Sequence, residues 1–575
     1  MLASAASLGS THARLRLALI LTVVLVAFVS ILSRSAFTSP QIKHIWKTAS
    51  SFRAKTSHET GHKAATHLEV DVNGKHSSHH STLLSSTEDD YDGDEDFSYY
   101  DSPIKASEED QSEEYGYDGR GYLSQQPAAP QSLASDATDI CASAPDSSNI
   151  FISMKTGASV LHAKLPAHLL TLWNCIHKDQ IMIFSDLEDT YAGHKVHDAV
   201  ANVSSVFKDG NDDFEQYRQL QMAREQRTDP NNLRGGRAWE LDKWKFLPLT
   251  FSVWEHAPAH IEWFVFIEAD TSVSWLNLLL WLKTWDPKKE LYIGAPRVVN
   301  DVGFAHGGSG YVMSRPALAK LAAFREEEDP EVYDYRWENF TNTNGFGDAI
   351  VARALKEVGV KLENGDPFVQ SEPLQTIELT EGKLCNPVVT LHHVDGVLIS
   401  DLWQMQSDWV KKYGWHEPYL RKHIFDYFIA DVIVDTRYEW TNFADRRRLI
   451  ANESAFEDEL RRDDFILKEK MNEAEQAAIV SQDSWDCVEA CEKWEECMQW
   501  QWRPGRCYLG SDIRLGQMYV ERDAEKDHKD RKEWKERDKA KDTEKWIWTS
   551  GWHRERVEKL RLKVDTCAWD PKPHT

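Results

Sequence analysis

Two carboxylates, Glu268 and Asp270, follow an apolar run and are the side chains best placed for chemistry. Residues 263–267 (Trp-Phe-Val-Phe-Ile) are all apolar, which predicts a strand buried on both faces. Apolar residues recur at helical spacing from Trp275 onward. The acids therefore stand at the carboxyl end of a strand, where open α/β sheets bind ligands. Such an edge either holds a divalent cation that binds phosphates or is a solvated strand end.

Two more apolar runs predict strands that end at the same edge. Residues 149–154 lead into Lys155 and Thr156, and residues 180–185 lead into Asp186. A helical pattern lies between the two runs, so this region predicts a βαβ unit and a parallel sheet. Asp186 then either lines the ligand edge or caps a helix.

Three short motifs further along add candidates. Gly307 and Gly308 lie in a glycine-rich turn whose backbone can approach a ligand closely. Asp348 opens a helical pattern, either as an N-cap or as an acid in a site. His392 and His393 end another apolar run, and imidazole can complete an oxygen-rich site for Mn²⁺.

Length and charge limit the classes of protein to consider. The chain has 575 residues, too many for one ordinary domain, and a formal net charge of −26, which argues against nucleic acid as a partner. Residues 88–118 contain fourteen Asp and Glu residues, so we expect this segment to be disordered.

The N-terminus predicts a membrane anchor. The apolar run lies within residues 14–33, with a cytosolic tail at 1–13 before it and a disordered acidic stem at 34–138 after it. A cleaved signal peptide is the alternative, but Arg34 interrupts the small residues that a cleavage site needs. We therefore expect an uncleaved anchor and a lumenal body.

Cysteines and sequons support the lumenal prediction. Cys141 and Cys175 bracket the first βαβ unit and are predicted to pair. Three Asn-x-Ser/Thr sequons are present, at Asn202, Asn339 and Asn452.

A cysteine cluster follows residues 446–480, whose charged, helical pattern predicts a spacer helix. Its members are Cys487, Cys491, Cys497 and Cys507. Clustered cysteines suggest zinc in a cytosolic chain, but no Cys-x2-Cys pair is present. Cys487 and Cys491 are one helical turn apart and face the same side.

The motifs "MKTG", "FSD", "FIEAD", "HGGSGY", "GDA" and "TLHH", in that order, resemble glycosyltransferase family 31. This family is the fringe and β-1,3-galactosyltransferase group, and the match is best to its fungal branch. The resemblance covers residues 141–394. It implies a GT-A fold, a Rossmann-like α/β domain, over residues 139–445. It also implies a UDP-sugar donor and usually Mn²⁺.

The resemblance also implies roles for individual residues. Asp270 matches the metal-binding end of the acidic motif that begins at Glu268, and either His392 or His393 matches a metal ligand. Ala269 departs from the fringe-type motif, which has an acid there. Asp348 matches the catalytic base. Thr156 and Asp186 match positions near the nucleotide, and Gly307 and Gly308 would let backbone amides approach the donor or acceptor.

The cysteine cluster resembles the core of PAN/Apple domains. This resemblance implies a disulfide-stapled module within residues 481–575 that contacts protein or glycan. It also implies nested bridges, with Cys491 joined to Cys497 inside a Cys487–Cys507 bridge.

Together these patterns predict a Golgi or ER enzyme with a single type II membrane helix. It would transfer a hexose or N-acetylhexosamine from a UDP-sugar to a glycan or glycoprotein acceptor, with inversion and Mn²⁺ dependence. The alternative is a non-catalytic glycan- or protein-binding protein with a degenerate transferase domain, which Ala269 favours. The donor sugar, the acceptor and the linkage are open.

Overall fold

The structure is a computed structural model and covers most of the chain after residue 139. It describes residues 140–233, 237–299, 301–451, 465–466, 470–518 and 547–574. The predicted anchor at 14–33 and stem at 34–138 lie outside these ranges. Within them, no helix combines the length and apolar character needed to cross a membrane.

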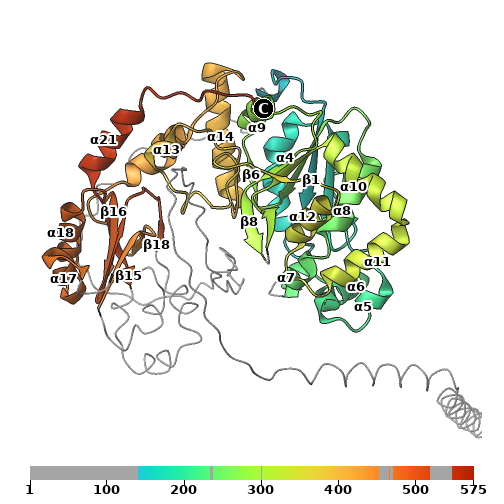
Figure 1. The fold of residues 1–575 in the computed structure, drawn as a ribbon, viewed down its shortest axis with the longest axis horizontal. Coiled ribbons are helices and arrows are strands. Elements are labelled where there is room, and N and C mark those ends of the chain that lie inside the picture. Colours follow the sequence, from blue (N-terminus) through green and yellow to red (C-terminus); the bar gives the residue numbers. More distant parts are fainter. Residues whose placement is uncertain are drawn as a thin grey trace, which may run out of the picture. The chain divides into compact units, whose positions relative to one another are not determined.

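An eight-stranded sheet forms the centre of the first domain, in the order β11-β7-β10-β5-β1-β2-β4-β3 (Figure 1). The strands are β1 (Ile150–Lys155), β2 (Ile181–Ser185), β3 (Asp189–Tyr191), β4 (His194–Asp198), β5 (Trp263–Glu268), β7 (Tyr292–Gly294), β10 (Tyr311–Ser314) and β11 (Leu362–Asn364). β1 is parallel to β2 and β5, which confirms the predicted unit. β10 runs antiparallel to β5 and β7, so the sheet is mixed rather than wholly parallel.

The two central strands are buried on both faces, as their sequences predict. Ile152 and Met154 of β1 and Val265 of β5 belong to one core cluster, while Phe151 and Phe264 belong to another. Burying each of these side chains contributes about 1.5–3 kcal/mol, so the strands hold the residues at their ends firmly.

Helices cover both faces of the sheet (Figure 1). The first cluster includes side chains of α4 (Leu161–Leu170), α9 (Trp275–Leu282) and α14 (Gly396–Tyr413). The second includes side chains of α8 (Phe246–His256), α10 (Arg315–Glu328), α11 (Pro330–Thr341) and α12 (Gly347–Glu357). The result is a mixed α/β domain.

Two short strand pairs shape the edge where the acids lie. β6 (Ser272–Val273) pairs antiparallel with β12 (Thr390–Leu391), which brings the histidine pair beside the acidic strand end. β8 (Pro296–Val299) and β9 (Val302–Ala305) form a hairpin. The hairpin leads into residues 306–310, called the glycine loop below.

The helical spacer predicted over 446–480 is wrong at its start. β14 (Arg447–Ile450) is a strand that pairs with β17 (Arg506–Gly510) and buries Leu449 and Ile450. Pairing with a distant strand overrides the local helical pattern here. Within the part of this stretch that the structure describes, the helix is α17 (Glu473–Val480).

The C-terminal part is a five-stranded sheet in the order β15-β14-β17-β16-β19, with helices beside it. Its other elements are β15 (Phe465–Ile466), α18 (Trp485–Lys493), β16 (Gln499–Arg503), β19 (Thr549–Trp552) and α21 (Arg554–Val564). The sequence did not predict these strands. Residues 499–503 alternate polar and apolar residues, but both kinds are buried.

All eight cysteines are paired, so none is left as a zinc ligand. The bridges Cys141–Cys175, Cys487–Cys507 and Cys491–Cys497 confirm the predicted pairs. The fourth bridge, Cys385–Cys567, joins residues 182 positions apart and was not predicted.

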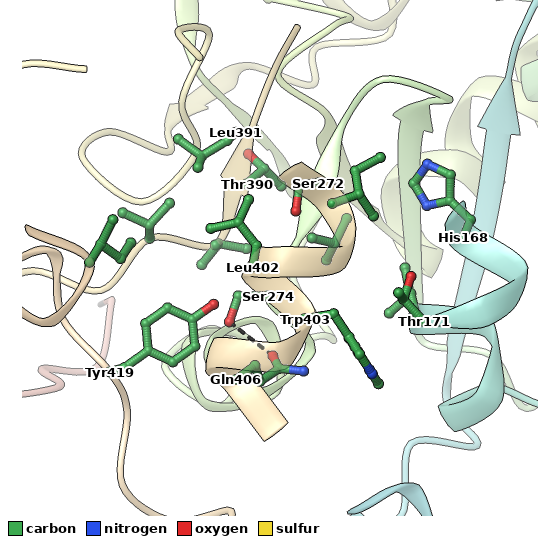
Figure 2. Close-up of a pocket in the computed structure, with 16 residues that line it drawn as sticks. His168, Thr171, Ser272, Ser274, Thr390, Leu391, Leu402, Trp403, Gln406 and Tyr419 are labelled. Atoms are coloured by element: carbon green, nitrogen blue, oxygen red, sulfur yellow. Dashed lines mark hydrogen bonds between the residues drawn. The ribbon is translucent and has the colours of Figure 1, made fainter. Parts of the chain in front are cut away.

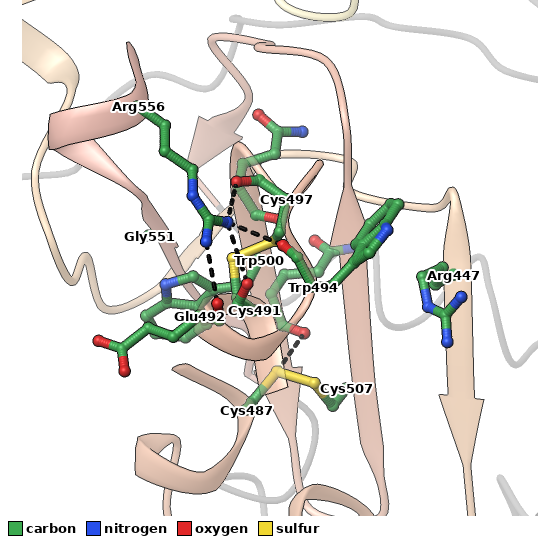
Figure 3. Close-up of a disulfide and its surroundings, with 12 residues drawn as sticks. Arg447, Cys487, Cys491, Glu492, Trp494, Cys497, Trp500, Cys507, Gly551 and Arg556 are labelled. Carbon is green, nitrogen blue, oxygen red and sulfur yellow. Dashed lines mark hydrogen bonds between the residues drawn. A yellow bond between two sulfur atoms is a disulfide. The ribbon is translucent and has the colours of Figure 1, made fainter. Parts of the chain in front are cut away.

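Arg556 of α21 binds the loop that the Cys491–Cys497 bridge closes at the end of α18 (Figure 3). Its guanidinium donates to the carbonyl oxygens of Cys491, Glu492, Trp494 and Cys497 at 2.8–3.2 Å. Carbonyl groups at a helix C-terminus lack partners within the helix, so a cation there is favourable. The C-terminal helix thus stabilises the cysteine segment.

Candidate functional site

Asp270 and the two histidines meet at the end of β5. His392 Nε2 lies 3.6 Å from Asp270 Oδ1, and His393 Nδ1 lies 4.0 Å from Asp270 Oδ2. One ligand atom from each of the three residues lies within 4.8 Å of the others. The backbone fixes this meeting, because the Val394 N–H donates to the Asp270 carbonyl at 2.9 Å. One carboxylate and two imidazoles suit a divalent transition metal.

The two histidines have different environments. His392 is buried, and its ring packs so close to Gly308 that a Cβ there would lie 2.1 Å from the imidazole. Gly308 therefore has to be glycine. His393 is half-exposed and has a backbone φ of +54°, a conformation that few non-glycine residues adopt.

Burial and charge set the protonation of this group. Burial opposes the charged form of Asp270, but the neighbouring His392 and the charge of Lys164 hold the Asp270 pKa well below its usual value. Burial and the neighbouring His392 lower the pKa of His393 to about 4. His393 is therefore neutral at pH 7, which is the state that binds metals.

Helix α4 supplies two partners that no sequence motif indicated. Lys164 Nζ donates to Asp270 Oδ2 at 2.7 Å. His168 Nε2 lies 2.8 Å from the Ala269 carbonyl oxygen. Since that oxygen can only accept, the Nε2 of His168 must carry a proton. Both residues occur in an ordinary amphipathic helix, so nothing in their spacing sets them apart.

Asp348 is held by two backbone N–H groups. Its Oδ2 accepts from Gly307 at 2.7 Å and its Oδ1 accepts from Ala349 at 2.9 Å. Asp348 is the second residue of α12, and the N-cap is Phe346, so the N-cap interpretation of Asp348 is wrong. Burial raises the pKa of Asp348 to about 6, despite the two backbone hydrogen bonds.

The glycine loop connects Asp348 with the Asp270–histidine group. Gly307 donates to Asp348, and the next residue, Gly308, packs on His392 and accepts from Thr271 Oγ1 at 2.7 Å. Ser309 O accepts from Thr390 Oγ1 at 2.6 Å. A Cβ on Gly307 would also lie 2.7 Å from the Phe246 ring. The loop can therefore pack this close to Phe246 and His392 only with glycine at both positions.

Glu268 pairs with a lysine and is not part of the Asp270–histidine group. Its Oε1 lies 3.1 Å from Lys155 Nζ, which also contacts Asp242 of α7 (Arg237–Asp242). Burial opposes the charge on Lys155, yet the two carboxylates outweigh it and raise the Lys155 pKa. Glu268 thus belongs to a buried ion-pair network, and the group that could hold a metal does not include it.

Asp186 and Thr156 lie at the other end of that network. Lys245 Nζ lies 3.0 Å from Asp186 Oδ2 and donates to the Thr156 carbonyl at 3.2 Å. Asp186 Oδ1 accepts from the Ala158 N–H at 2.7 Å, which holds the turn after β1. Thr156 Oγ1 is buried and has no hydrogen-bond partner within the described ranges.

A small cavity lies next to the candidate site (Figure 2). His168, Ser272 and Thr390 are among its lining residues. Gln406 Oε1 accepts from Ser274 Oγ at 3.2 Å and from the Leu276 N–H at 3.0 Å. The side chains around the cavity thus tie α14 to the start of α9, next to the strands that carry Asp270 and His392.

Comparison with known proteins matches part of the chain to a family. Residues 146–393 match the family model described as Fringe-like, and no curated protein matches the chain. The matched range contains every predicted site residue, from Thr156 to His393. The mixed sheet with helices on both faces is consistent with the GT-A fold. Residues 146–393 therefore form a Fringe-like domain, of the glycosyltransferase family 31 type.

Proposed function

We propose that this protein is a Golgi or ER glycosyltransferase with a type II membrane anchor. It transfers a hexose or N-acetylhexosamine from a UDP-sugar to a glycan or glycoprotein acceptor. The observation that carries the proposal is the glycine loop: Gly307 binds Asp348, and the adjacent Gly308 packs on His392. Two consecutive glycines thus contact the proposed general base and the proposed metal-binding group.

Asp270, His392 and His393 would hold the divalent cation, with Mn²⁺ as the expected ion. The donor set fits such an ion, because it combines a carboxylate with imidazoles. His392 Nε2 is the nearer nitrogen to Asp270, and the half-exposed His393 would complete the set. When bound, the cation supplies a Lewis acid for the diphosphate leaving group.

Asp348 would act as the general base. The acceptor hydroxyl loses its proton to the Asp348 carboxylate while its oxygen forms a bond to the anomeric carbon. The bond from that carbon to the diphosphate oxygen breaks, and UDP leaves. Attack from the face opposite UDP inverts the configuration. A pKa of about 6 suits this role, because the acid is ionised at neutral pH yet remains a useful base.

Thr156, Asp186 and Glu268 would serve the donor side of the site. Thr156 contributes a buried hydroxyl without a partner among the described residues, which can hydrogen-bond the nucleotide. Asp186 and Glu268 act through the lysines they hold in place. Gly307 and Gly308 leave room for the donor beside the backbone, since neither has a side chain.

Four disulfides and two sequons support a lumenal location. Disulfides persist in the oxidising secretory pathway and are rare in the cytosol. Asn202 and Asn339 are exposed, as a glycan acceptor must be. Asn452 lies outside the described residues, as does the anchor at 14–33.

A second candidate function is a non-catalytic glycan- or protein-binding protein. The contact between Lys164 and Asp270 favours it, because an ammonium group sits where a cation would bind. Ala269, which stands in place of a further acid, points the same way.

Release of UDP tests the proposal. Full-length protein in detergent is incubated with a panel of UDP-sugars, with Mn²⁺ or with a chelator. We expect Mn²⁺-dependent UDP release that is lost in Asp270→Asn and kept in the surface variant Asp435→Asn. If no donor gives UDP release and the protein binds glycans equally well with and without Mn²⁺, the result would favour the non-catalytic binding protein.

A further inference from the structure

Two aromatic side chains stand exposed near the candidate base. Trp239 is 47% exposed and Phe346 is 44% exposed. Their ring centroids lie 5.8 Å apart, with the planes nearly perpendicular at 84°. Among the tryptophans within the described ranges, only Trp239 and Trp485 are exposed, and Trp485 lies in the C-terminal part. Together the two rings offer an apolar, aromatic surface to a ligand.

The pair is connected to the site by short chain segments. Phe346 is the N-cap of α12 and precedes Asp348 by two residues. A Cβ on Gly345 would lie 3.8 Å from the Trp239 ring, so the segment leading to Asp348 starts against that ring. Three residues span at most roughly 11 Å, so the aromatic pair lies within about two sugar rings of the base.

The rest of α7 and α12 holds the two rings in place. Asp242, at the end of α7, is bound by Lys155 and Lys245. A Cβ on Gly347 would lie 2.3 Å from Phe246, so the backbone beside Phe346 is tightly packed. The rings therefore project from a fixed frame, which reduces the entropy lost when a ligand binds.

We propose that Trp239 and Phe346 form the acceptor subsite, which takes a terminal pyranose of a glycan. A pyranose has C–H groups on one face, and these pack on the electron-rich face of an aromatic ring. The hydroxyl groups around the sugar edge remain free to reach Asp348. This inference rests on the proposed function, and it assigns that function a carbohydrate acceptor rather than a peptide hydroxyl.

Saturation-transfer NMR tests the subsite directly. The full-length protein is loaded with UDP and Mg²⁺, a diamagnetic ion that does not broaden the probe signals as Mn²⁺ would. It is offered four probes: the methyl β-glycosides of galactose, glucose and N-acetylglucosamine, and methyl α-mannoside. We expect at least one probe to receive saturation at its ring C–H protons. The signal should fall at least fivefold in Trp239→Leu and in Phe346→Leu, which keep an apolar side chain but lose the aromatic face.

Trp485→Leu is the matched control, because it removes another exposed tryptophan and should leave the signal unchanged. Saturation that survives in Trp239→Leu, or no saturation of any probe by the wild type, overturns the subsite. Calorimetry of UDP and Mn²⁺ binding is run in parallel on all variants. If the wild type does not bind UDP, the proposed function itself is contradicted. If the wild type binds UDP but Trp239 and Phe346 do not bind the sugar probes, only the subsite is contradicted.

Discussion

Lys164 Nζ lies 2.7 Å from Asp270 Oδ2, on the same carboxylate that faces His392 and His393. The lysine comes from α4 and is partly exposed, so its side chain is able to move away. A divalent cation bound to Asp270 would compete with this ammonium group. On the proposed function, the lysine would act as an internal cation that competes with the metal for Asp270.

Removing the lysine should strengthen metal binding to the free protein. A partly exposed ion pair contributes about 0.2–1 kcal/mol, so Lys164→Met should raise Mn²⁺ affinity by roughly 1.4- to fivefold. Electron paramagnetic resonance of free Mn²⁺ measures the change. Lys320→Met is the control, because it breaks a similarly exposed pair with Glu290. Glu290 precedes β7, whose first residue is level with the start of β5, at the opposite edge of the sheet from Asp270. Weaker binding in Lys164→Met would mean that the lysine supports the metal site.

Gly308→Ala should disrupt the metal group while leaving the fold in place. The added Cβ would lie 2.1 Å from the His392 ring, so the imidazole has to move away from Asp270. Changes to residues that only orient a metal ligand cost about 10–100-fold in affinity, and we expect a loss of at least this size. Gly303→Ala is the control, because its Cβ would meet nothing within 4 Å. Equal Mn²⁺ affinity in both variants would contradict the assignment of His392.

Of the site residues that the sequence predicts at one edge of the sheet, three lie together there: Asp270, His392 and His393. Asp270, His392 and His393 each end an apolar run, and strand ends are the positions that an apolar pattern predicts best. Asp348 was found through its motif. Its partner, the Gly307 N–H, lies far along the chain, and no local pattern shows such a contact.

Other features depended on packing that a sequence does not reveal. Lys164 reaches Asp270 because α4 packs beside the residues that follow β5, where His168 also contacts Ala269. Glu268 pairs with Lys155, since Lys155 and Glu268 are opposite each other in the β1–β5 register. The sequence of β14 has a helical pattern but forms a strand, because β17 offers it an edge to pair with.

The Cys385–Cys567 bridge should hold the C-terminal tail against the first domain. Lys422 Nζ reinforces it by donating to the carbonyl oxygens of Val564, Asp565 and Cys567 at 2.6–3.2 Å. The double variant with both cysteines changed to serine should lose about 2–4 kcal/mol of stability. Limited proteolysis should then release the segment after residue 553. If that segment stays as resistant as in the wild type, the hydrogen bonds of Lys422 and Arg556 are sufficient without the bridge.

Asp348→Asn should separate turnover from donor binding. Loss of a general base lowers turnover by roughly 10²–10⁴-fold, whereas the introduced amide cannot alter the metal group directly. UDP affinity in the presence of Mn²⁺ should stay within about twofold, unlike in Asp270→Asn. In the wild type, kcat/KM should rise with pH through about 6, because the base must lose its proton. A variant that turns over normally would remove Asp348 from the mechanism.

The same substitution should change how the stability of the protein depends on pH. Burial raises the pKa of Asp348 from 3.8 to about 6, so the folded state holds the proton more tightly than the unfolded state does. The stability that the protonated acid contributes is complete below about pH 4 and is lost as the pH rises through about 6. A shift of this size corresponds to about 3 kcal/mol.

An asparagine at this position stays neutral at every pH, and its one amide oxygen can accept from Gly307 or from Ala349 but not from both. The lost hydrogen bond costs the same at every pH, so the unfolding temperature of Asp348→Asn relative to the wild type should be higher at pH 8 than at pH 4. Differential scanning calorimetry at the two pH values measures both differences, with the surface variant Asp286→Asn as the control. If the difference in unfolding temperature between Asp348→Asn and the wild type is the same at pH 4 and pH 8, the charge of Asp348 does not destabilise the folded protein. Burial then does not raise the pKa of Asp348.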